Sequence, residues 1–376
     1  MSQIVVNHVW KIYPRGNVVG VKDLSFTCRD REFLAILGPS GGGKSSTLRM
    51  LAGLEEISRG EISFDGKPVN NLGPAERNIA LAFESYALYQ RLTVYENIAF
   101  PLRARKMSGA EVDRKVTWIA ELLDLIPVLN KYPSSLAGGH QQRVSLARAF
   151  VRKPNVTLLD EPISHMDQRV RAALRARIRR LHDELGLTTV YVTHDQAEAI
   201  SLCDRLAIIN RAELQQIGTV DEIWNRPANR FVACFVGEPS MNLVGGRMES
   251  RGEVSIPTPE GKVLLPFRGE IDEKYAGAGI TVGFRPQQVR LLRNKPDKTQ
   301  ENTKGNASIP GSVKITEFQG ETTVLTVVLG DVSRSEIKSV VPADERYAAG
   351  DTVWVHAAPD AIHLFDGEAP VLRRCA

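Results

Sequence analysis

One segment constrains the fold of this chain more than any other: residues 38–45 read Gly-Pro-Ser-Gly-Gly-Gly-Lys-Ser and fit the pattern G-x-x-x-x-G-K-[ST]. The apolar run 33–37 precedes it and the helical pattern of residues 46–51 follows, as the motif requires. The glycines let successive backbone N–H groups converge on phosphate oxygens without obstruction by a Cβ atom. The sequence therefore predicts a phosphate-binding loop between a buried strand and a helix.

Two side chains of this loop are expected to act on a bound nucleotide. Lys44 would reach the β- and γ-phosphates, and the Ser45 hydroxyl would ligate Mg²⁺. The other expected nucleotide contacts are Gly38, Ser40, Gly41, Gly42, Gly43 and Ser46. A phosphate loop alone leaves kinases, helicases and GTPases open, so the reaction has to be inferred from later motifs.

Length and composition narrow the class of protein. A chain of 376 residues with 43% hydrophobic content is expected to form two or three domains. A net charge of +4 favours neither a nucleic acid nor an anionic membrane as partner. The cysteines Cys28, Cys203, Cys234 and Cys375 show no metal-site or redox spacing and are expected to be reduced thiols. No apolar stretch of 18 residues and no signal-peptide pattern occur, so we expect any role at a membrane to depend on partner proteins.

The pattern along the chain changes twice. Residues 1–235 alternate strand and helix patterns, which predicts an α/β domain with a largely parallel sheet. Between about 85 and 150 the pattern is mostly helical, which predicts an inserted all-α subdomain. Residues 236–376 contain short β-type runs separated by Gly, Pro and Asp, which predicts a small β domain. Residues 293–306 contain no large apolar side chain and are expected to form a surface loop.

Local signals place the elements of the first domain. The expected strands include residues 33–37, 156–160, 188–193 and 205–209. A cap residue followed three positions later by glutamate indicates the start of a helix. This pattern occurs at Thr93 and Glu96, at Ser108 and Glu111, and at Asp195 and Glu198.

Three polar residues are expected at the sheet edge beside the phosphate loop. Asp160 ends a buried strand, where its carboxylate is placed to coordinate Mg²⁺ directly or through water. Glu161 follows and can polarise the attacking water as a general base. His194 ends the run 188–193 and can hydrogen-bond the γ-phosphate and that water. Each also has a structural alternative, a solvated strand end or a structural histidine, but beside this loop we favour the catalytic interpretation.

A second anion-binding element is expected in the helical region. Gly138 and Gly139 precede a helix that runs to Phe150, so bare N–H groups and the positive end of a helix dipole face an anion. Because this helix belongs to the inserted subdomain, away from Lys44, we expect it to contact the nucleotide of another subunit.

These motifs, in this order, resemble those of the ATP-binding cassette (ABC) ATPases over essentially the whole chain. The resemblance implies a P-loop NTPase domain of ABC type, ATP and Mg²⁺ as cofactors, and a second cassette subunit, of the same or a different chain. By position, the resemblance assigns residues 38–45 to Walker A and Tyr13 to the aromatic that stacks on adenine. It assigns Asp160 and Glu161 to Walker B, His194 to the switch, and Glu84 to the Q-loop with an oxygen for Mg²⁺. The signature is assigned to Ala137, Gly138, Gly139 and His140, and the D-loop of the dimer to Asp167. For Tyr13 a purely structural role fits nearly as well.

The C-terminal part resembles a narrower group, the maltose and glycerol-phosphate importer ATPases, whose β domain is a small barrel of the oligonucleotide-fold type. The resemblance is carried by residues 230–237, 241–243, 283–286 and 363–366. It implies the ATP-hydrolysing subunit of a bacterial importer for a sugar, polyol or glycerol-type solute, peripheral on the cytoplasmic face of the inner membrane. The implied partners are integral membrane permease subunits and a periplasmic or lipid-anchored solute-binding protein, with no nucleic acid. Residues 86–89 resemble the permease-contacting segment, although helix packing explains their side chains equally well.

Three positions depart from the family pattern. Ala137 stands in place of serine, His140 in place of glutamine, and Glu84 in place of the Q-loop glutamine. Loss of a hydroxyl that donates to the γ-phosphate is expected to cost roughly 1.5–3 kcal/mol, or about 10- to 150-fold. Glu84 keeps an oxygen for Mg²⁺, loses an N–H donor, and adds a negative charge that is expected to raise nearby carboxyl pKa values.

Two other functions are compatible with these motifs. The chain could be a weakly hydrolysing, ATP-gated regulatory subunit of a heterodimeric cassette pair, since its signature is altered while Lys44, Asp160, Glu161 and His194 are intact. It could also be a non-transport cassette ATPase of translation or DNA maintenance. That class is expected to carry tandem cassettes or a long coiled-coil insertion, and the sequence has neither.

Overall fold

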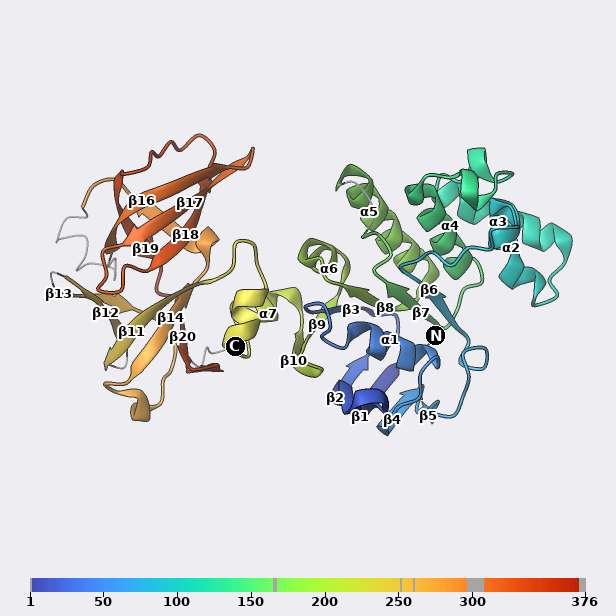
Figure 1. Ribbon diagram of the computed structural model, residues 1–376, viewed down its shortest axis with the longest axis horizontal. Coiled ribbons are helices and arrows are strands. Elements are labelled where there is room, and N and C mark those ends of the chain that lie inside the picture. The colour runs from blue at the N-terminus through green and yellow to red at the C-terminus, as the bar shows by residue number, and fades with distance from the viewer. Residues whose placement is uncertain (1, 165–167, 251, 260, 296–307, 372–376) are drawn as a thin grey trace. The chain divides into compact units, whose positions relative to one another are not determined.

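The computed structural model describes residues 2–164, 168–250, 252–259, 261–295 and 308–371 (Figure 1). Asp167, Cys375 and most of the loop expected at 293–306 lie outside the described residues. The chain divides into two compact units, Met1–Val220 and Asp221–Ala376. The division falls before residue 235, so helix α8 (Arg230–Phe235) and nearly all of α7 (Val220–Asn225) belong by their contacts to the second unit. The domain boundary at 235 stays a prediction.

A six-stranded sheet forms the centre of the first unit, in the order β10-β9-β3-β8-β7-β6. Strands β9, β3, β8, β7 and β6 are parallel, and β10 pairs antiparallel with β9. The bounds are β3 Phe33–Leu37, β6 Ile79–Ala82, β7 Val156–Asp160, β8 Thr188–Thr193, β9 Arg205–Asn210 and β10 Glu213–Gly218. The four strands expected from sequence are therefore present, and the predicted largely parallel sheet is confirmed.

Successive residues of these strands point to opposite faces and fill two separate cores. Phe33 and Tyr191 pack in a core with the long helix α5 (Gln168–Leu185), whereas Leu34 and Val190 pack in a core with α1 (Lys44–Ala52). Both faces are covered, which is why β3 is continuously apolar and β8 is a fully buried run of β-branched and aromatic residues. A short helix, α6 (Gln196–Leu202), contacts β3 and β8.

A second, antiparallel sheet of the first unit has the order β2-β1-β4-β5. Its strands are β1 Ile4–Tyr13, β2 Val18–Cys28, β4 Arg59–Phe64 and β5 Lys67–Pro68, with the 3-10 helix η1 (Arg15–Asn17) between the first two. Buried residues of β1, such as Ile4 and Val6, share the core that contains Leu48 of α1. This sheet therefore packs on the same side of the unit as α1.

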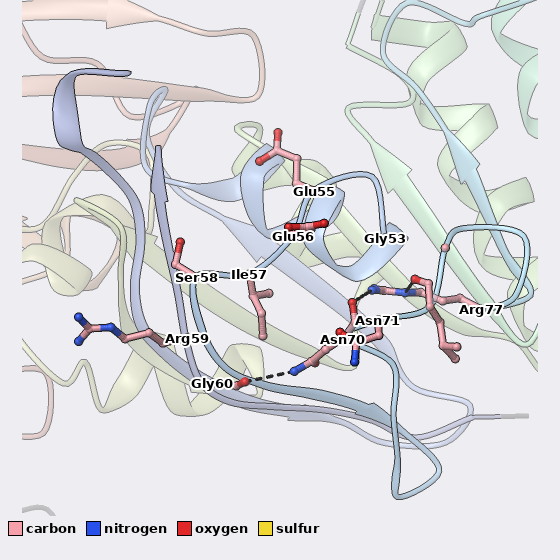
Figure 2. Close-up of a pocket in the computed structure, with 12 residues that line it drawn as sticks. Gly53, Glu55, Glu56, Ile57, Ser58, Arg59, Gly60, Asn70, Asn71 and Arg77 are labelled. Carbon is pink, nitrogen blue, oxygen red and sulfur yellow. Dashed lines mark hydrogen bonds between the residues drawn. The ribbon is translucent and has the colours of Figure 1, made fainter. Parts of the chain in front are cut away.

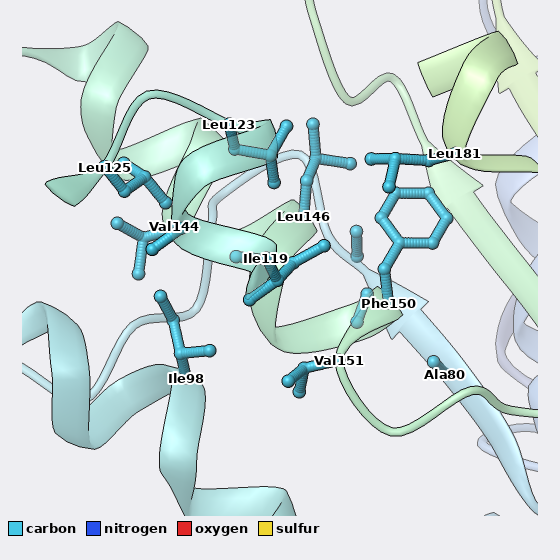
Figure 3. Close-up of a cluster of buried hydrophobic side chains, with 14 of the residues drawn as sticks. Ala80, Ile98, Ile119, Leu123, Leu125, Val144, Leu146, Phe150, Val151 and Leu181 are labelled. Carbon is cyan, nitrogen blue, oxygen red and sulfur yellow. The ribbon is translucent and has the colours of Figure 1, made fainter. Parts of the chain in front are cut away.

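The chain between β6 and β7 is mainly helical. Its elements are α2 Val94–Arg103, α3 Gly109–Leu122 and α4 Gly138–Phe150, with the 3-10 helices η2 Ile126–Val128 and η3 Pro133–Ser135. Figure 3 shows Ile98, Ile119 and Val144 of the three helices packed together, with Phe150 near Ala80 of β6 and Leu181 of α5. Helix α4 thus belongs to one hydrophobic core that joins the helical region to the sheet.

The three expected helix starts are present, with different cap chemistry. Thr93 and Glu96 form a reciprocal capping box. Ser108 precedes α3 without a side-chain cap hydrogen bond. Asp195 accepts from the Glu198 N–H, but the Glu198 side chain does not return to the cap. That carboxylate instead accepts hydrogen bonds from the Tyr191 and Thr193 hydroxyls, each at 2.9 Å.

The second unit contains two antiparallel sheets, ordered β13-β12-β11-β14-β20-β21 and β15-β19-β16-β17-β18. The bounds are β11 Asn242–Ser250, β12 Glu253–Thr258, β13 Gly261–Pro266, β14 Gly279–Phe284, β15 Val289–Leu292, β16 Ser308–Phe318, β17 Thr322–Leu329, β18 Glu336–Pro342, β19 Thr352–Ala357, β20 His363–Asp366 and β21 Ala369–Pro370, with 3-10 helices η4 Glu273–Tyr275 and η5 Pro286–Gln288. Val254 and Val282 of one sheet share a core with Leu325 and Val353 of the other. The predicted small barrel-like β domain is confirmed.

A buried arginine joins the helical start of the second unit to its sheet. Arg285 follows β14 and is 1% exposed, with its guanidinium carbon 3.7 Å from the centre of the Trp224 ring. It donates to the carbonyl oxygens of Val236 at 2.6 Å and Trp224 at 2.8 Å. Burial lowers the pKa of Arg285 to about 10, so the group remains a cation at neutral pH.

None of the helices in the described ranges combines the length and apolar character needed to cross a bilayer.

Candidate nucleotide site

The register of the parallel sheet brings the sequence-predicted motifs to one edge. Leu37, which directly precedes the phosphate loop, lies opposite Thr193, which precedes His194. On the other side of β8, Asp160 lies opposite Val192. Because parallel strands present their carboxyl ends at the same edge, the loop, Asp160, Glu161 and His194 converge there. This is the arrangement expected from the sequence.

Close backbone approaches require glycine in the phosphate loop. A Cβ atom on Gly38 would lie 2.1 Å from the carbonyl oxygen of Ile209, and one on Gly43 would lie 2.5 Å from the carbonyl oxygen of Gly20. Gly43 also has a φ of 101°, which favours glycine. These glycines therefore allow the loop to pack against β9 and β2, in addition to the phosphate contacts predicted for them.

Lys44 is held inside the loop by the loop itself. Its ammonium donates to the carbonyl oxygens of Gly38 at 2.9 Å and Pro39 at 3.0 Å, and the residue is 6% exposed. Burial lowers the pKa of Lys44, while the carboxylates of Glu161 and Asp160 act in the opposite direction. The cation is therefore oriented before any ligand binds, and it lies within the field of both acidic residues.

Asp160 carries a perturbed carboxyl group. Burial, followed by the Glu161 and Glu84 carboxylates, raises its pKa to about 6, against the opposing effect of Arg49 and Lys44. The expectation that Glu84 raises a neighbouring carboxyl pKa is therefore confirmed for Asp160. Crowded negative charge of this kind favours binding of a cation.

The oxygen groups at this edge fit Mg²⁺. No group of three or more His, Cys, Asp or Glu side chains within the described ranges could hold a metal without other ligands. Mg²⁺, however, is usually bound through one or two carboxylates together with substrate phosphates and water. The Asp160 carboxylate and the Ser45 hydroxyl supply hard oxygen donors of that type, and Glu84 adds a third within electrostatic range of Asp160.

Glu161 and His194 form a direct pair. The Nδ1 atom of His194 lies 2.9 Å from Oε2 of Glu161, whose side chain is 18% exposed, against 55% for the histidine. Glu161 has a φ of 44°, and its N–H donates to the carbonyl oxygen of Val192 at 2.9 Å. A non-glycine residue in this region is strained, and such strain is concentrated at functional sites. The neighbouring strand thus fixes both the backbone and the side chain of Glu161.

Tyr13 ends β1 beside the first turn of α1. Its hydroxyl donates to Oε2 of Glu55 at 2.6 Å and lies 2.9 Å from the Ser46 hydroxyl. This position next to the phosphate loop is compatible with contact to a nucleotide base. Its contact with a base stays a prediction.

The signature segment starts α4 without a side-chain cap. Ala137 is the N-cap residue and makes no cap hydrogen bond, and in the described ranges the N–H groups of Gly138 and Gly139 have no acceptor. No hydrogen bond or ion pair of the described residues joins this segment to Lys44, Asp160 or Glu161. Burial, then Arg143 and Lys131, lower the pKa of His140, so its ring is neutral at pH 7.

Sequence reasoning missed two arginines that support the motifs. Arg148 of α4 donates to the carbonyl oxygens of Ala87 at 2.8 Å and Tyr86 at 3.1 Å, and so ties the segment after Glu84 to the signature helix. Both residues have positive φ values, which exposes their carbonyl groups to this arginine. The available signal for Arg148 was its position between the apolar pairs Leu146-Ala147 and Ala149-Phe150.

Arg77 binds the far end of the phosphate-loop helix. It donates to the carbonyl oxygens of Met50 at 2.6 Å and Leu51 at 2.9 Å, near the C-terminus of α1, where a cation is favoured. Figure 2 shows Arg77 at one side of a polar pocket that is also lined by Glu55, Glu56, Arg59 and Asn70. No sequence pattern indicated this contact, because the partners are main-chain atoms.

Comparisons with known proteins agree with this geometry. The family model described as ABC transporter matches residues 21–164, and the model described as TOBE domain matches residues 281–365. A solved dimeric ATP-binding cassette, in a post-hydrolysis state bound to ADP and Pi, has a TM-score of 0.54 and 29% identity, covering 58% of this chain and 98% of that chain. The chain belongs to the ABC transporter ATP-binding proteins and is an ATPase of that type, as the sequence resemblance implied.

Particular relatives match over nearly the full length. The chain is 40% identical over 374 residues to the trehalose/maltose import ATP-binding protein MalK of Thermococcus litoralis, covering 97% of this chain and 98% of the relative. It is 36% identical over 384 residues to the multiple sugar-binding transport ATP-binding protein MsmK of Streptococcus mutans, covering 98% of each. The resemblance to carbohydrate-importer ATPases is thus confirmed as a similarity.

Proposed function

We propose that this chain is the ATP-hydrolysing subunit of a bacterial importer for a sugar, polyol or glycerol-type solute. The observation that carries the proposal is the Glu161–His194 pair, joined at 2.9 Å on the sheet edge that also carries Lys44 and Asp160. Two relatives, the trehalose/maltose import protein MalK and the multiple sugar-binding transport protein MsmK, support a carbohydrate as the solute.

In this proposal the phosphate loop binds and orients ATP. The backbone N–H groups of residues 38–45 surround the phosphates, and Lys44 exchanges its two loop carbonyls for β- and γ-phosphate oxygens. Ser45, Asp160 and Glu84 would hold Mg²⁺, which would neutralise part of the phosphate charge. The raised pKa of Asp160 returns toward its usual range when a cation occupies the cluster.

The Glu161–His194 pair then promotes hydrolysis. His194 Nδ1–H donates to Oε2 of Glu161, which leaves Oε1 to accept a proton from water. The water oxygen forms a bond to the γ-phosphorus as the bond between that phosphorus and its bridging oxygen breaks, giving ADP and phosphate. The opposite edge of the imidazole is available to the γ-phosphate.

A second cassette subunit completes the site in this proposal. The N–H groups of Gly138 and Gly139, which have no acceptor among the described residues, would face the γ-phosphate bound by the partner's phosphate loop, together with Ala137 and His140. Asp167 would lie at the same dimer interface. The further partners are integral membrane permease subunits and a periplasmic or lipid-anchored solute-binding protein. The chain therefore works peripherally on the cytoplasmic face of the inner membrane. Residues 1–235 form the nucleotide domain and residues 236–376 a regulatory domain.

The test is the dependence of turnover on protein concentration. Hydrolysis per subunit should rise with concentration across the dissociation range of the dimer, and Lys44→Ala should abolish nucleotide binding. A constant rate per subunit over that range would rule out the composite site. Weighing the subunits of the native transporter distinguishes the pairing: two copies of this chain and no other cassette exclude a heterodimer.

A further inference from the structure

The hydroxyl of Tyr13 contacts residues from both ends of α1, the helix that follows the phosphate loop. It donates to Oε2 of Glu55, which follows α1, at 2.6 Å, and it lies 2.9 Å from the hydroxyl of Ser46 in the first turn of α1. Burial raises the pKa of this phenol, and the bond to Glu55 raises it further, so it remains a hydroxyl donor at neutral pH. One atom of Tyr13 is therefore fixed from both ends of α1.

The rest of the Tyr13 ring is also held in place. The Lys11 ammonium lies 5.0 Å from the ring centre, within range of a cation–π contact on one face. Gly20 borders an edge of the ring, where an added Cβ would lie 2.6 Å from Cε2 of Tyr13. In the described ranges no aromatic ring stacks on Tyr13.

Glu55 is the centre of this arrangement. Its side chain is only 18% exposed and lies 3.6 Å from the Lys11 ammonium and 3.5 Å from an Arg49 nitrogen. Lys11 is further fixed by its donation to the Glu56 carbonyl oxygen at 2.7 Å. A single carboxylate thus anchors both the hydroxyl of Tyr13 and the cation that covers its ring.

We propose that Glu55 is a positioning residue that holds Tyr13 in the orientation needed to stack on the nucleotide base. The inference rests on the proposed function, in which Tyr13 faces the adenine of ATP. Ordering one aromatic side chain in advance removes an entropic penalty from binding, which corresponds to about 3- to 10-fold in affinity. Ser46 completes the anchor from the phosphate side.

The experiment is a double-mutant cycle measured with two ligands. Dissociation constants for ATP and for inorganic tripolyphosphate are determined for the full chain, for Tyr13→Phe, for Glu55→Ala and for the double variant. Each single variant should weaken ATP binding about 3- to 10-fold, and the double variant should be no weaker than either, because both remove the same anchor. Tripolyphosphate has no base, so its affinity should not change.

Two further variants separate positioning from folding. Glu55→Gln keeps an oxygen that accepts from Tyr13 and should retain ATP affinity within about 2-fold. Glu56→Ala removes the adjacent carboxylate, which makes no side-chain hydrogen bond in the described ranges, and should change neither ligand. Equal losses for ATP and tripolyphosphate, or fully additive losses in the cycle, would overturn the role of Glu55. Wild-type affinity in Tyr13→Ala would overturn the base contact itself, whereas absence of ATP binding by the unaltered chain would refute the proposed function.

Discussion

The two halves of the proposed ATP site are built differently. At the sheet edge, Lys44 is bonded to loop carbonyls and Glu161 to His194, so the groups are oriented in the free chain. At the start of α4, the N–H groups of Gly138 and Gly139 have no acceptor among the described residues, and Ala137 provides no cap. The first half is pre-organised by its own chain, and the second is complete only when a ligand supplies the missing acceptors.

The two halves of the site have different roles: the sheet edge carries out the chemistry, and the start of α4 regulates assembly. Residues that transfer protons and bind the metal must hold their geometry, and rigid strands achieve that. A helix end without a partner costs some stability in the free chain and recovers it on ligand binding. The uncapped end of α4 therefore favours assembly with nucleotide present.

The largest effect is expected from a substitution that disables only the catalytic half of the site. Glu161→Gln should reduce turnover by about 10²- to 10⁴-fold, because the amide cannot accept the proton from water. ATP binding should persist, so an ATP-bound dimer should accumulate in size-exclusion chromatography. Lys44→Ala is the matched control, with neither binding nor dimer. Retention of more than about a tenth of wild-type turnover would exclude Glu161 as the general base.

The next prediction concerns a substitution that restores the family's serine in the signature half of the site. Ala137→Ser should raise turnover of a homodimer about 10- to 150-fold if the hydroxyl reaches the partner's γ-phosphate. Serine at an N-cap should also stabilise α4 by about 0.5–2 kcal/mol. Turnover and thermal unfolding are therefore measured together. A rise in stability without a rise in turnover would show that the hydroxyl caps the helix and does not reach nucleotide.

The effect of the crowded negative charge around Asp160 is tested by measuring the free energy of unfolding in the absence of Mg²⁺ and nucleotide. Its folded pKa of about 6 lies above the unfolded value, so the native chain binds the proton more tightly and loses stability as pH rises from about 4 to 6. Asp160→Asn should therefore raise the free energy of unfolding at pH 7.5 by roughly 1–3 kcal/mol, the lower end reflecting solvent screening. The gain should vanish below about pH 4. An equal gain at both pH values would refute the electrostatic cause.

The smallest effect is expected from Glu84→Gln. Removing this carboxylate lowers the pKa of Asp160, so the acidic limb of the pH–rate profile should move downward. Turnover should also depend less on Mg²⁺ concentration, since one negative charge near the cation is gone. Superimposable Mg²⁺ and pH profiles for the two proteins would show that Glu84 points away from the metal during turnover.

The sequence was most informative where a pattern is local. Apolar runs located β3, β7 and β9, a β-branched and aromatic run located β8, and cap patterns located the starts of α2, α3 and α6. Parallel strand order then brought Asp160, Glu161 and His194 to the phosphate loop. Their catalytic roles stay predictions, because geometry alone does not measure proton transfer.

Contacts to main-chain atoms could not be predicted. Arg77 binds carbonyl groups at the end of α1, and Arg285 binds carbonyl groups of residues 224–236. Carbonyl groups are the same at every position, so no residue pattern marks the acceptor. The cap pattern at Asp195 and Glu198 correctly predicted the start of α6, but it could not show that the Glu198 carboxylate accepts from the Tyr191 and Thr193 hydroxyls.

The contact between Gly38 and Ile209 limits which substitutions the chain can accept at these two positions. The atom that excludes a side chain at position 38 is a carbonyl oxygen, 2.1 Å from where the Cβ would be. Every amino acid has that oxygen, so no replacement at position 209 removes the obstruction. In a genetic selection that starts from Gly38→Ala, suppressors should therefore be true revertants or changes that shift β9 as a whole, and compensating side chains at position 209 should not appear.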